Sequence, residues 1–161
     1  LILSILNDLE IKATFFLVGQ NIEQFPELTN EIIKSGHIVG NHTYSHKDGF
    51  ITNNAIYFND IEKNNMIENK AMIFRPPYGR ITLPQIKYLR KKYKIIMWDV
   101  FTWDFKKKRS KRIKKNILNN VEKGSIIVLH NNSKSYQNLK ESLKSSLVEL
   151  KNLGYSFSTT W

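Results

Sequence analysis

Runs of consecutive apolar residues alternate along the chain with segments in which apolar residues recur every three or four positions. A run such as Ala13–Val18, which ends at Gly19, is typical of a strand buried on both faces. A segment such as Leu139–Leu150 collects its leucines on one side of a helix. About five such alternations predict a mainly parallel sheet connected by helices, either an α/β barrel or a doubly wound layer.

The individual elements follow from these patterns and from the glycines, asparagines and prolines between them. We expect helices at residues 1–9, 21–36, 51–69, 83–93 and 110–122, and a last one from Leu139 that closes near Gly154. We expect strands at residues 13–18, 37–40, 71–74, 94–98, 125–129 and 155–159. In the second helix Asn21 is the expected N-cap, and the residues expected to face the core are Ile22, Phe25, Leu28, Ile32 and Ile33.

The length of 161 residues allows one hydrophobic core but not two comfortable ones, so we interpret residues 1–161 as a single domain. Because the sequence has no cysteine, disulfides and thiolate metal ligands are excluded, which leaves histidines and carboxylates as candidate ligands. No apolar segment approaches the roughly 20 residues that a membrane-spanning helix needs.

The net charge of +11 is concentrated between Lys87 and Lys123. The segment Lys106–Lys115 suggests either a nucleic-acid-binding patch or the solvated face of a helix. No aromatic residue lies within that segment to stack on bases. The sequence therefore favours the solvated helix over the nucleic-acid interpretation.

Two of the four histidines, His42 and His46, lie four positions apart directly after the apolar run at residues 37–40. If residues 43–46 form one helical turn, both imidazoles face the same side and can bind one metal ion. The alternative is a polar loop whose histidines only cap and hydrogen-bond.

Unusual polar residues follow the predicted strands, and they are His42, His46, Arg75, Asp99, Asp104 and His130. The carboxyl ends of parallel strands converge on one rim, which is where α/β folds bind and react. This shared position favours the metal-site interpretation of the two histidines over the capping interpretation.

The order of these motifs resembles that of the NodB-like polysaccharide deacetylases, which are metal-dependent carbohydrate esterases. The segments that carry the resemblance are Ala13–Gly19, Gly36-His37, Gly40–His46, Arg75–Gly79, Trp98–Asp104 and Leu129-His130, so it covers essentially the whole chain. The resemblance implies a distorted (β/α) barrel that removes N-acetyl groups from a hexosamine polymer, chitin-like, peptidoglycan or related. It also implies work outside the cytoplasm, in the cell envelope or the extracellular space.

The resemblance assigns catalytic roles to three histidines. His42 and His46 would hold a divalent metal, commonly zinc, which would polarise the acetyl carbonyl and lower the pKa of its bound water. His130 would be the general acid that protonates the leaving amine. The fourth histidine, His37, precedes an apolar strand and is expected to be structural.

The resemblance assigns supporting roles to four further residues. Arg75 would orient and charge-balance the catalytic carboxylate, unless it only caps backbone carbonyls. Tyr78 would offer its backbone N–H to the tetrahedral oxyanion. Trp98 and Leu129 would line the pocket that receives the acetyl methyl group.

One motif of the family is missing from the sequence. The family places a Thr-Phe-Asp-Asp-Gly strand end, with the general base and the third metal ligand, ahead of the point where this sequence begins. Asp8 and Asp48 are unconvincing substitutes for those carboxylates. We therefore expect a truncated deacetylase that lacks the first strand of its barrel and is inactive by itself.

A second departure lies around the candidate acid. Phe101 and Phe105 stand where the family often has an aspartate, which orients the acid histidine, and a tryptophan. Whether Asp99 or Asp104 supports His130 is therefore open, and Asp99 is alternatively a residue that only hydrogen-bonds within its loop. Two other functions also stay open, a catalytically inactive carbohydrate-binding relative and, less favoured, a basic nucleic-acid-binding domain.

Overall fold

The computed structural model describes residues 1–64, 72–106 and 110–160. The chain divides into two compact units, which we call the central unit and the terminal unit. The central unit comprises Lys12–Met97 with Thr159–Trp161, and the terminal unit comprises Leu1–Ile11 with Trp98–Ser158. The predicted single domain is not tested by this division and stays a prediction.

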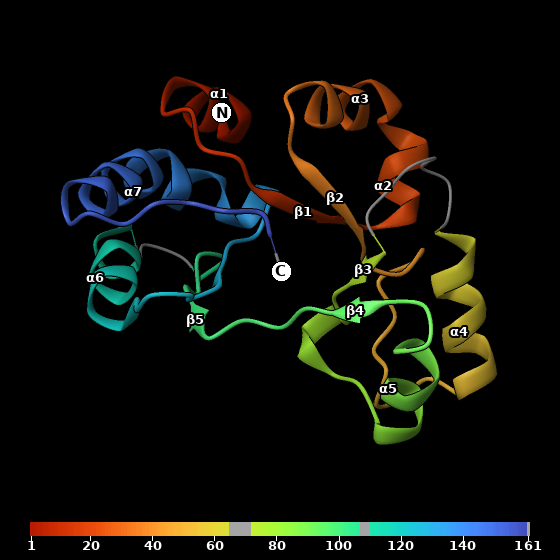
Figure 1. The fold of residues 1–161 in the computed structure, drawn as a ribbon. Coiled ribbons are helices and arrows are strands. Elements are labelled where there is room, and N and C mark those ends of the chain that lie inside the picture. Colours follow the sequence, from red (N-terminus) through yellow and green to blue (C-terminus); the bar gives the residue numbers. More distant parts are fainter. Residues whose placement is uncertain (65–71, 107–109, 161) are drawn as a thin grey trace. The chain divides into compact units, whose positions relative to one another are not determined.

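The central unit contains a parallel four-stranded sheet (Figure 1). Its strands, in sheet order, are β1 (Thr14–Leu17), β2 (Ile38–Asn41), β3 (Ile73–Phe74) and β4 (Lys94–Ile95). Its helices are α2 (Gly19–Gln24), α3 (Pro26–Lys34), α4 (Asn54–Lys63) and α5 (Leu83–Leu89), with a 3-10 turn at Pro77–Gly79. One core cluster of this unit consists of Tyr57, Ile61, Phe74, Leu89 and Tyr93.

The terminal unit pairs two short parallel strands, β5 (Val100–Phe101) and β6 (Ile127–Val128). Its helices are α1 (Ile2–Asp8), α6 (Ser110–Asn120) and α7 (Ser133–Asn152). Val100 of β5, Ile113 and Ile117 of α6 and Leu150 of α7 form its core cluster. Helix α1 contacts α7, and the Lys144 ammonium lies 3.0 Å from the Asp8 carboxylate.

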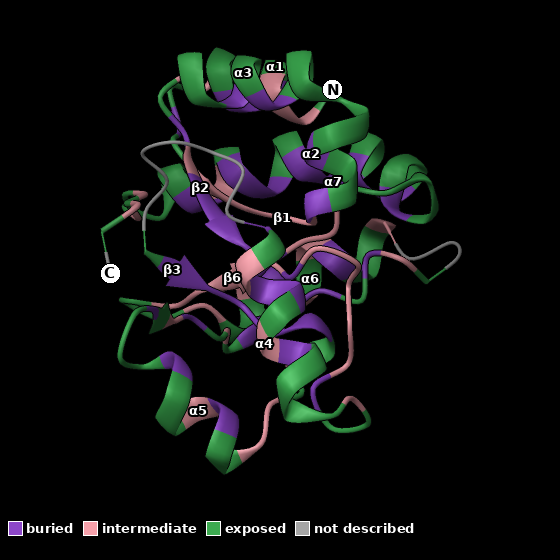
Figure 2. Ribbon diagram, turned by 90° about the vertical axis from the view of Figure 1, so that its right-hand side faces the viewer, coloured by how far each residue is buried: buried purple, intermediate pink, exposed green. Residues whose placement is uncertain are grey.

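Helices in both units bury one face and expose the other (Figure 2), as their apolar spacing predicts. All described strand pairs are parallel, which confirms the predicted sheet type. Among the described residues, no helix is both long enough and apolar enough to cross a lipid bilayer. The predicted helix at 51–69 begins later, as α4, and its residues 65–69 lie outside the described residues.

The predicted helix at residues 21–36 is wrong in its continuity, because it is broken into α2 and α3 at Phe25. Pro26 has no backbone N–H, and it starts α3 at the first helical position, where that donor is not needed. Because the helix is broken, its apolar residues do not form one continuous buried face. Of the five residues predicted to face the core, only Ile22 and Ile32 are buried. Asn21 lies inside α2 and is not its N-cap.

Three strand predictions also differ from the structure. Strand β1 is half-buried rather than buried on both faces, and it lies at the edge of the described sheet. Residues 155–159 form no strand among the described residues, because Tyr155 and Phe157 pack as side chains against the Val100 cluster instead. Strand β5 lies at Val100–Phe101, where no strand is predicted.

The basic segment Lys106–Lys115 enters α6, although its residues 107–109 lie outside the described residues. Ile113 and Ile117 bury the inner face of α6, while Lys111 and Lys115 are exposed. Lys114 lies 3.6 Å from the Glu149 carboxylate of α7. The described part of the segment is therefore the solvated face of an amphipathic helix.

Candidate active site

His42 and His46 lie in the loop that follows β2, and their ring centroids are 5.0 Å apart. The helical turn that the sequence allows at residues 43–46 is not formed, and these residues form a loop. Thr43 and His46 instead have left-handed backbones, with φ of 62° and 58°. These two residues fold the loop back on itself, so the imidazoles approach each other without a helix.

The His42 ring has a defined orientation, because its Nδ1 lies 2.6 Å from the backbone carbonyl oxygen of Arg75. A carbonyl oxygen only accepts, so Nδ1 carries the hydrogen and donates it. In the neutral imidazole the lone pair then lies on Nε2. Metal-binding histidines are commonly held in this way, with one ring nitrogen donating to a carbonyl and the other binding the metal.

Arg75 is buried, with 8% of its surface exposed, and it follows β3. Its Nε and Nη2 donate to the carbonyl oxygens of Ile96 and Met97, at 3.0 and 2.9 Å, and its guanidinium lies over the Phe16 ring. Burial lowers the pKa of Arg75 to about 10, which leaves it charged at neutral pH. These contacts correspond to the carbonyl-capping alternative, and they fix the chain after β4 beside the chain after β3.

Tyr78 is exposed and has a left-handed backbone, with φ of 59°. Its ring meets that of His46 nearly at right angles, with 4.8 Å between the centroids. The tight turn of Arg75–Gly79 therefore brings Tyr78 to the histidine pair, as expected for residues that share one edge of the sheet.

The chemistry of the two histidines suits a divalent metal such as zinc, since imidazole nitrogen is a preferred ligand. Within the described ranges, however, no three residues among the histidines and carboxylates are grouped closely enough to hold a metal ion. Asp48 pairs with Arg80 at 2.7 Å, and Asp8 pairs with Lys144 in the terminal unit. Neither aspartate is thus placed as a third ligand.

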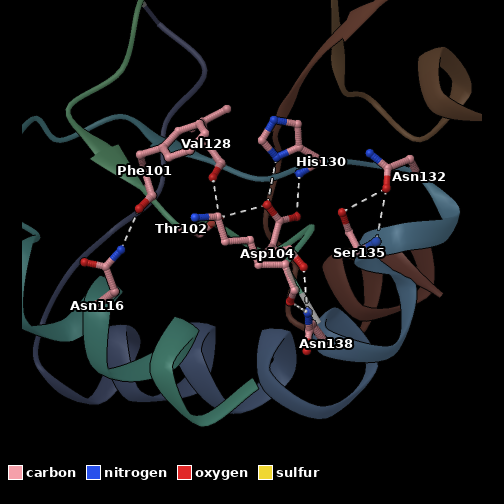
Figure 3. Close-up of polar contacts among 10 residues, drawn as sticks. Phe101, Thr102, Asp104, Asn116, Val128, His130, Asn132, Ser135 and Asn138 are labelled. Atoms are coloured by element: carbon pink, nitrogen blue, oxygen red, sulfur yellow. Dashed lines mark hydrogen bonds and ion pairs between the residues drawn. The ribbon is translucent and has the colours of Figure 1, made fainter. Parts of the chain in front are cut away.

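The terminal unit contains the second polar group, formed by Asp104 and His130 (Figure 3). Asp104 is fully buried, and its Oδ1 lies 2.7 Å from His130 Nδ1 while its Oδ2 accepts the backbone N–H of His130 at 2.7 Å. Burial opposes ionisation of this carboxyl, but the hydrogen bonds from His130 outweigh it and hold the pKa of Asp104 below its ordinary value. An ionised Asp104 accepts Nδ1–H and directs Nε2 of His130 away from itself.

Two residues that the sequence analysis did not select complete this group. The hydroxyl of Thr102 lies 3.1 Å from Asp104 Oδ1 and 2.9 Å from the Val128 carbonyl oxygen. Asn138 of α7 donates to the backbone carbonyl oxygen of Asp104 at 2.7 Å (Figure 3). Thr102 is close in sequence to the motif, whereas only the packing of α7 brings Asn138 to it.

Asp99 is not brought to His130. It precedes β5, where its carboxylate accepts hydrogen bonds from the Ser125 hydroxyl and from the Ile126 backbone N–H. Burial again opposes ionisation, but these bonds hold the pKa of Asp99 below its ordinary value. The predicted catalytic role of Asp99 is therefore not supported, because Asp99 stands at the amino end of β5 whereas His130 follows the carboxyl end of β6.

Aromatic rings surround the His130 imidazole. Phe101 and Phe105 both meet it at 86°, with centroids 5.7 and 5.0 Å away. Trp98 stacks on Phe101 at 5.7 Å, and Leu129 is half-buried beside His130 in the chain. The two phenylalanines at the unusual positions thus enclose the imidazole, and Asp104 binds its Nδ1.

Comparison with known proteins agrees with these motifs. Residues 1–95 match the sequence model of the polysaccharide deacetylase family. A peptidoglycan-N-acetylglucosamine deacetylase of Bacillus cereus is 36% identical over 165 residues, which cover 98% of this chain and 60% of that protein. PgdA, a deacetylase of the same name from Listeria monocytogenes, is 30% identical over an alignment of 92% of this chain and 32% of PgdA. The chain thus spans 60% or less of the length of these two relatives.

Two solved structures are similar along nearly the whole chain. A peptidoglycan N-acetylglucosamine deacetylase in complex with 4-naphthalen-1-yl-N-oxidanyl-benzamide has a TM-score of 0.92 at 35% identity, covering 98% of this chain and 77% of that one. A pseudoenzyme of the CE4 family from Bacillus anthracis has a TM-score of 0.88 at 26% identity, covering 97% of this chain and 56% of that one. The predicted α/β fold class is confirmed by the first of these similarities.

Proposed function

The chain belongs to the polysaccharide deacetylase family, and we propose from this that the protein hydrolyses the N-acetyl groups of an N-acetylhexosamine polymer. Peptidoglycan is the first candidate substrate, because the most similar relatives above are named for it. From the same family membership we also propose that the protein acts in the cell envelope or the extracellular space.

The observation that carries the proposal is the pair of bonds between Asp104 and His130. Amide hydrolysis breaks the bond between the acetyl carbon and the nitrogen, and the leaving amine needs a proton. With Nδ1–H donated to Asp104, a second proton on Nε2 makes the ring an imidazolium, and Nε2 of that imidazolium would give its proton to the leaving amine. The ionised Asp104 orients the ring through these bonds and stabilises the imidazolium with its negative charge.

His42 and His46 are the proposed metal ligands, with zinc as the proposed metal. The bound cation supplies Lewis-acid chemistry toward an acetyl carbonyl. The Nδ1–H bond of His42 to the Arg75 carbonyl oxygen supports this assignment, since it leaves Nε2 as the ligand atom.

The remaining roles are also proposals. Tyr78 would donate its backbone N–H to the oxyanion, and its left-handed turn beside His46 supports that position. Arg75 would hold the turn in place through its bonds to two carbonyl oxygens and would balance the charge of a catalytic carboxylate. Trp98 and Leu129 would receive the acetyl methyl group.

The test is acetate release from N-acetylglucosamine oligomers and from peptidoglycan, with added zinc or cobalt and a chelator control. The protein assayed is the chain joined at its N-terminus to a Thr-Phe-Asp-Asp-Gly strand end, since the chain by itself is expected to be inactive. We expect His42→Ala and His130→Ala to lower kcat/KM by about 10²- to 10⁴-fold, the usual contribution of a positioned acid or a metal site. Asp104→Asn should lose a similar factor, because an amide does not hold the same imidazole tautomer. His37→Gln is the matched control, since His37 lies outside both groups, and it should retain activity.

A catalytically inactive glycan-binding protein is the second candidate, favoured by the similarity to the Bacillus anthracis pseudoenzyme. Binding to peptidoglycan without acetate release under any metal, by the folded chain with the Thr-Phe-Asp-Asp-Gly strand end joined to it, would support it. Release that persists in the presence of chelator, or that is unchanged in His42→Ala, would contradict the metal assignment instead.

A further inference from the structure

Asp60 of α4 lies against the loop that carries the histidine pair, which we call the histidine loop (residues 42–46). Asp60 is 9% exposed, and both of its carboxylate oxygens accept hydrogen bonds from that loop. Oδ2 accepts the backbone N–H groups of Tyr44 and Ser45 at 3.0 Å each, and Oδ1 accepts the Ser45 hydroxyl at 2.7 Å. One buried carboxylate thus binds the two central residues of the histidine loop.

The histidine loop has a backbone that needs such support. Thr43 and His46 are both left-handed, which is a genuine outlier for a β-branched residue such as Thr43. Backbones of this kind persist only where the surrounding structure holds them. The Asp60 bonds fall on Tyr44 and Ser45, between the two left-handed residues.

Two buried asparagines, Asn41 and Asn64, bind the backbone of Thr43 near the start of the histidine loop. Asn41 accepts the Thr43 backbone N–H at 2.9 Å, and its amide donates to the Ile61 carbonyl oxygen at 2.9 Å. Asn64 donates to the Thr43 carbonyl oxygen at 2.9 Å. Asp60 lies near the end of α4, and Asn64 is the C-cap of that helix. This end of the helix therefore binds Thr43, Tyr44 and Ser45, the three residues between His42 and His46.

We propose that Asp60 is a positioning residue, which holds the histidine loop in the conformation that presents both imidazoles together and so sets the affinity of the pair for a divalent cation. The proposal rests on the metal assignment in the proposed function. Asp60 acts through its hydrogen bonds and touches neither substrate nor cation. A hydrogen-bonding role and a role of its charge can be separated experimentally.

Three variants and one control separate these roles. Asp60→Ala removes all three side-chain bonds, whereas Asp60→Asn keeps an acceptor for the two N–H groups and places an amide donor beside the Ser45 hydroxyl. Glu62→Ala is the matched control, because it removes a carboxylate of the same helix that is half-buried and pairs with Lys92. Ser45→Ala removes one of the three bonds from the loop side, which keeps the test available if Asp60→Ala fails to fold.

Two readouts apply to the 161-residue chain. Calorimetric titration with zinc should show that Asp60→Ala binds about 10- to 100-fold more weakly, the usual effect of losing a partner behind the metal ligands. Ser45→Ala should lose a smaller factor, while Asp60→Asn and Glu62→Ala should stay near wild type. In the metal-free chain, the Ser45 amide should exchange with solvent faster in Asp60→Ala, whereas Tyr44 keeps a bond to the Asp60 backbone carbonyl oxygen at 2.9 Å.

Unchanged zinc affinity and unchanged Ser45 exchange in a folded Asp60→Ala variant would overturn the proposal. Equal losses in Asp60→Asn and Asp60→Ala would also overturn it, since the charge and not the bonds would then be responsible. If wild-type chain binds no zinc, the metal assignment of the proposed function fails, and the Ser45 exchange decides whether Asp60 holds the loop.

Discussion

His37 is a buried histidine that takes part in neither polar group. Its ring is 5% exposed and contacts Phe15, and its Nδ1 accepts the backbone N–H of Ala13 at 3.2 Å. Burial, together with the nearby Lys12 ammonium, lowers the pKa of His37 from its ordinary value of about 6.5. The neutral ring is therefore the form that suits the folded chain, because a protonated Nδ1 cannot accept.

This environment predicts a pH-dependent stability. When the folded pKa of a histidine lies below the unfolded one, its contribution is fully present above the unfolded pKa of about 6.5 and is lost as pH falls from there toward the folded pKa. We expect the free energy of unfolding, measured by urea denaturation, to fall between pH 7.5 and pH 5.5. The fall should be smaller in His37→Gln, which does not titrate, and an identical fall in both proteins would exclude His37 as its source.

At the scale of the element, β2 shows how closely the sheet of the central unit is packed. Gly40 of β2 pairs with Phe16 of β1 in the parallel register. A Cβ atom at Gly40 would lie 2.7 Å from carbons of the Phe16 ring and 2.8 Å from Cγ1 of Ile73. The glycine is therefore needed for its lack of a side chain, because its neighbours occupy that space.

Gly40→Ala should destabilise the protein by about 1–3 kcal/mol, the usual cost of overpacking a core. The measurement is the midpoint of urea unfolding, read by circular dichroism at an unchanged slope. A midpoint equal to that of the wild type would mean that Phe16 and Ile73 move aside without cost.

The same strand positions the first metal-ligand candidate, since His42 directly follows β2. The apolar run that ends at Gly40 is enough to predict β2, because short buried strands leave a continuous apolar signal. Such runs do not predict β5, whose two residues, Val100 and Phe101, lie among aspartates and tryptophans. Pairing with β6, which is distant in sequence, makes these residues a strand.

At the scale of the molecule, each unit has its own buried cluster. Leu89, which is 1% exposed, packs in the central unit with Tyr57 and Phe74, and Leu150, also 1% exposed, packs in the terminal unit with Val100 and Ile113. Truncating a buried leucine to alanine costs about 2–5 kcal/mol in either place. These two leucines therefore form a matched pair of probes, one for each unit.

Because the sequence predicts a single domain, we expect the chain to unfold in one cooperative thermal transition. Leu89→Ala and Leu150→Ala should both lower its Tm, by roughly 2–4 °C per kcal/mol lost. Tryptophan fluorescence reports mainly on the terminal unit through Trp98 and Trp103, whereas circular dichroism reports on all helices. If Leu150→Ala shifts only the fluorescence transition, the two units are separate domains and the single-domain prediction is wrong.

The sequence by itself determined the alternation of parallel strands and helices, the family, and the motifs that contain the candidate residues. These depend on local patterns, since apolar period and neighbouring residue types are visible along the chain. It also determined His42, His46, Arg75, Tyr78 and His130 as candidates, because each follows or lies within such a motif.

Only the tertiary structure decided which partner each candidate has. Asp104 and not Asp99 binds His130, because β5 lies between the two aspartates and sends them to opposite ends of the strand pair. Left-handed residues held by a distant helix, and not a helical turn, bring His42 and His46 together. Hydrogen bonds between residues far apart in sequence depend on packing, and no local pattern encodes them.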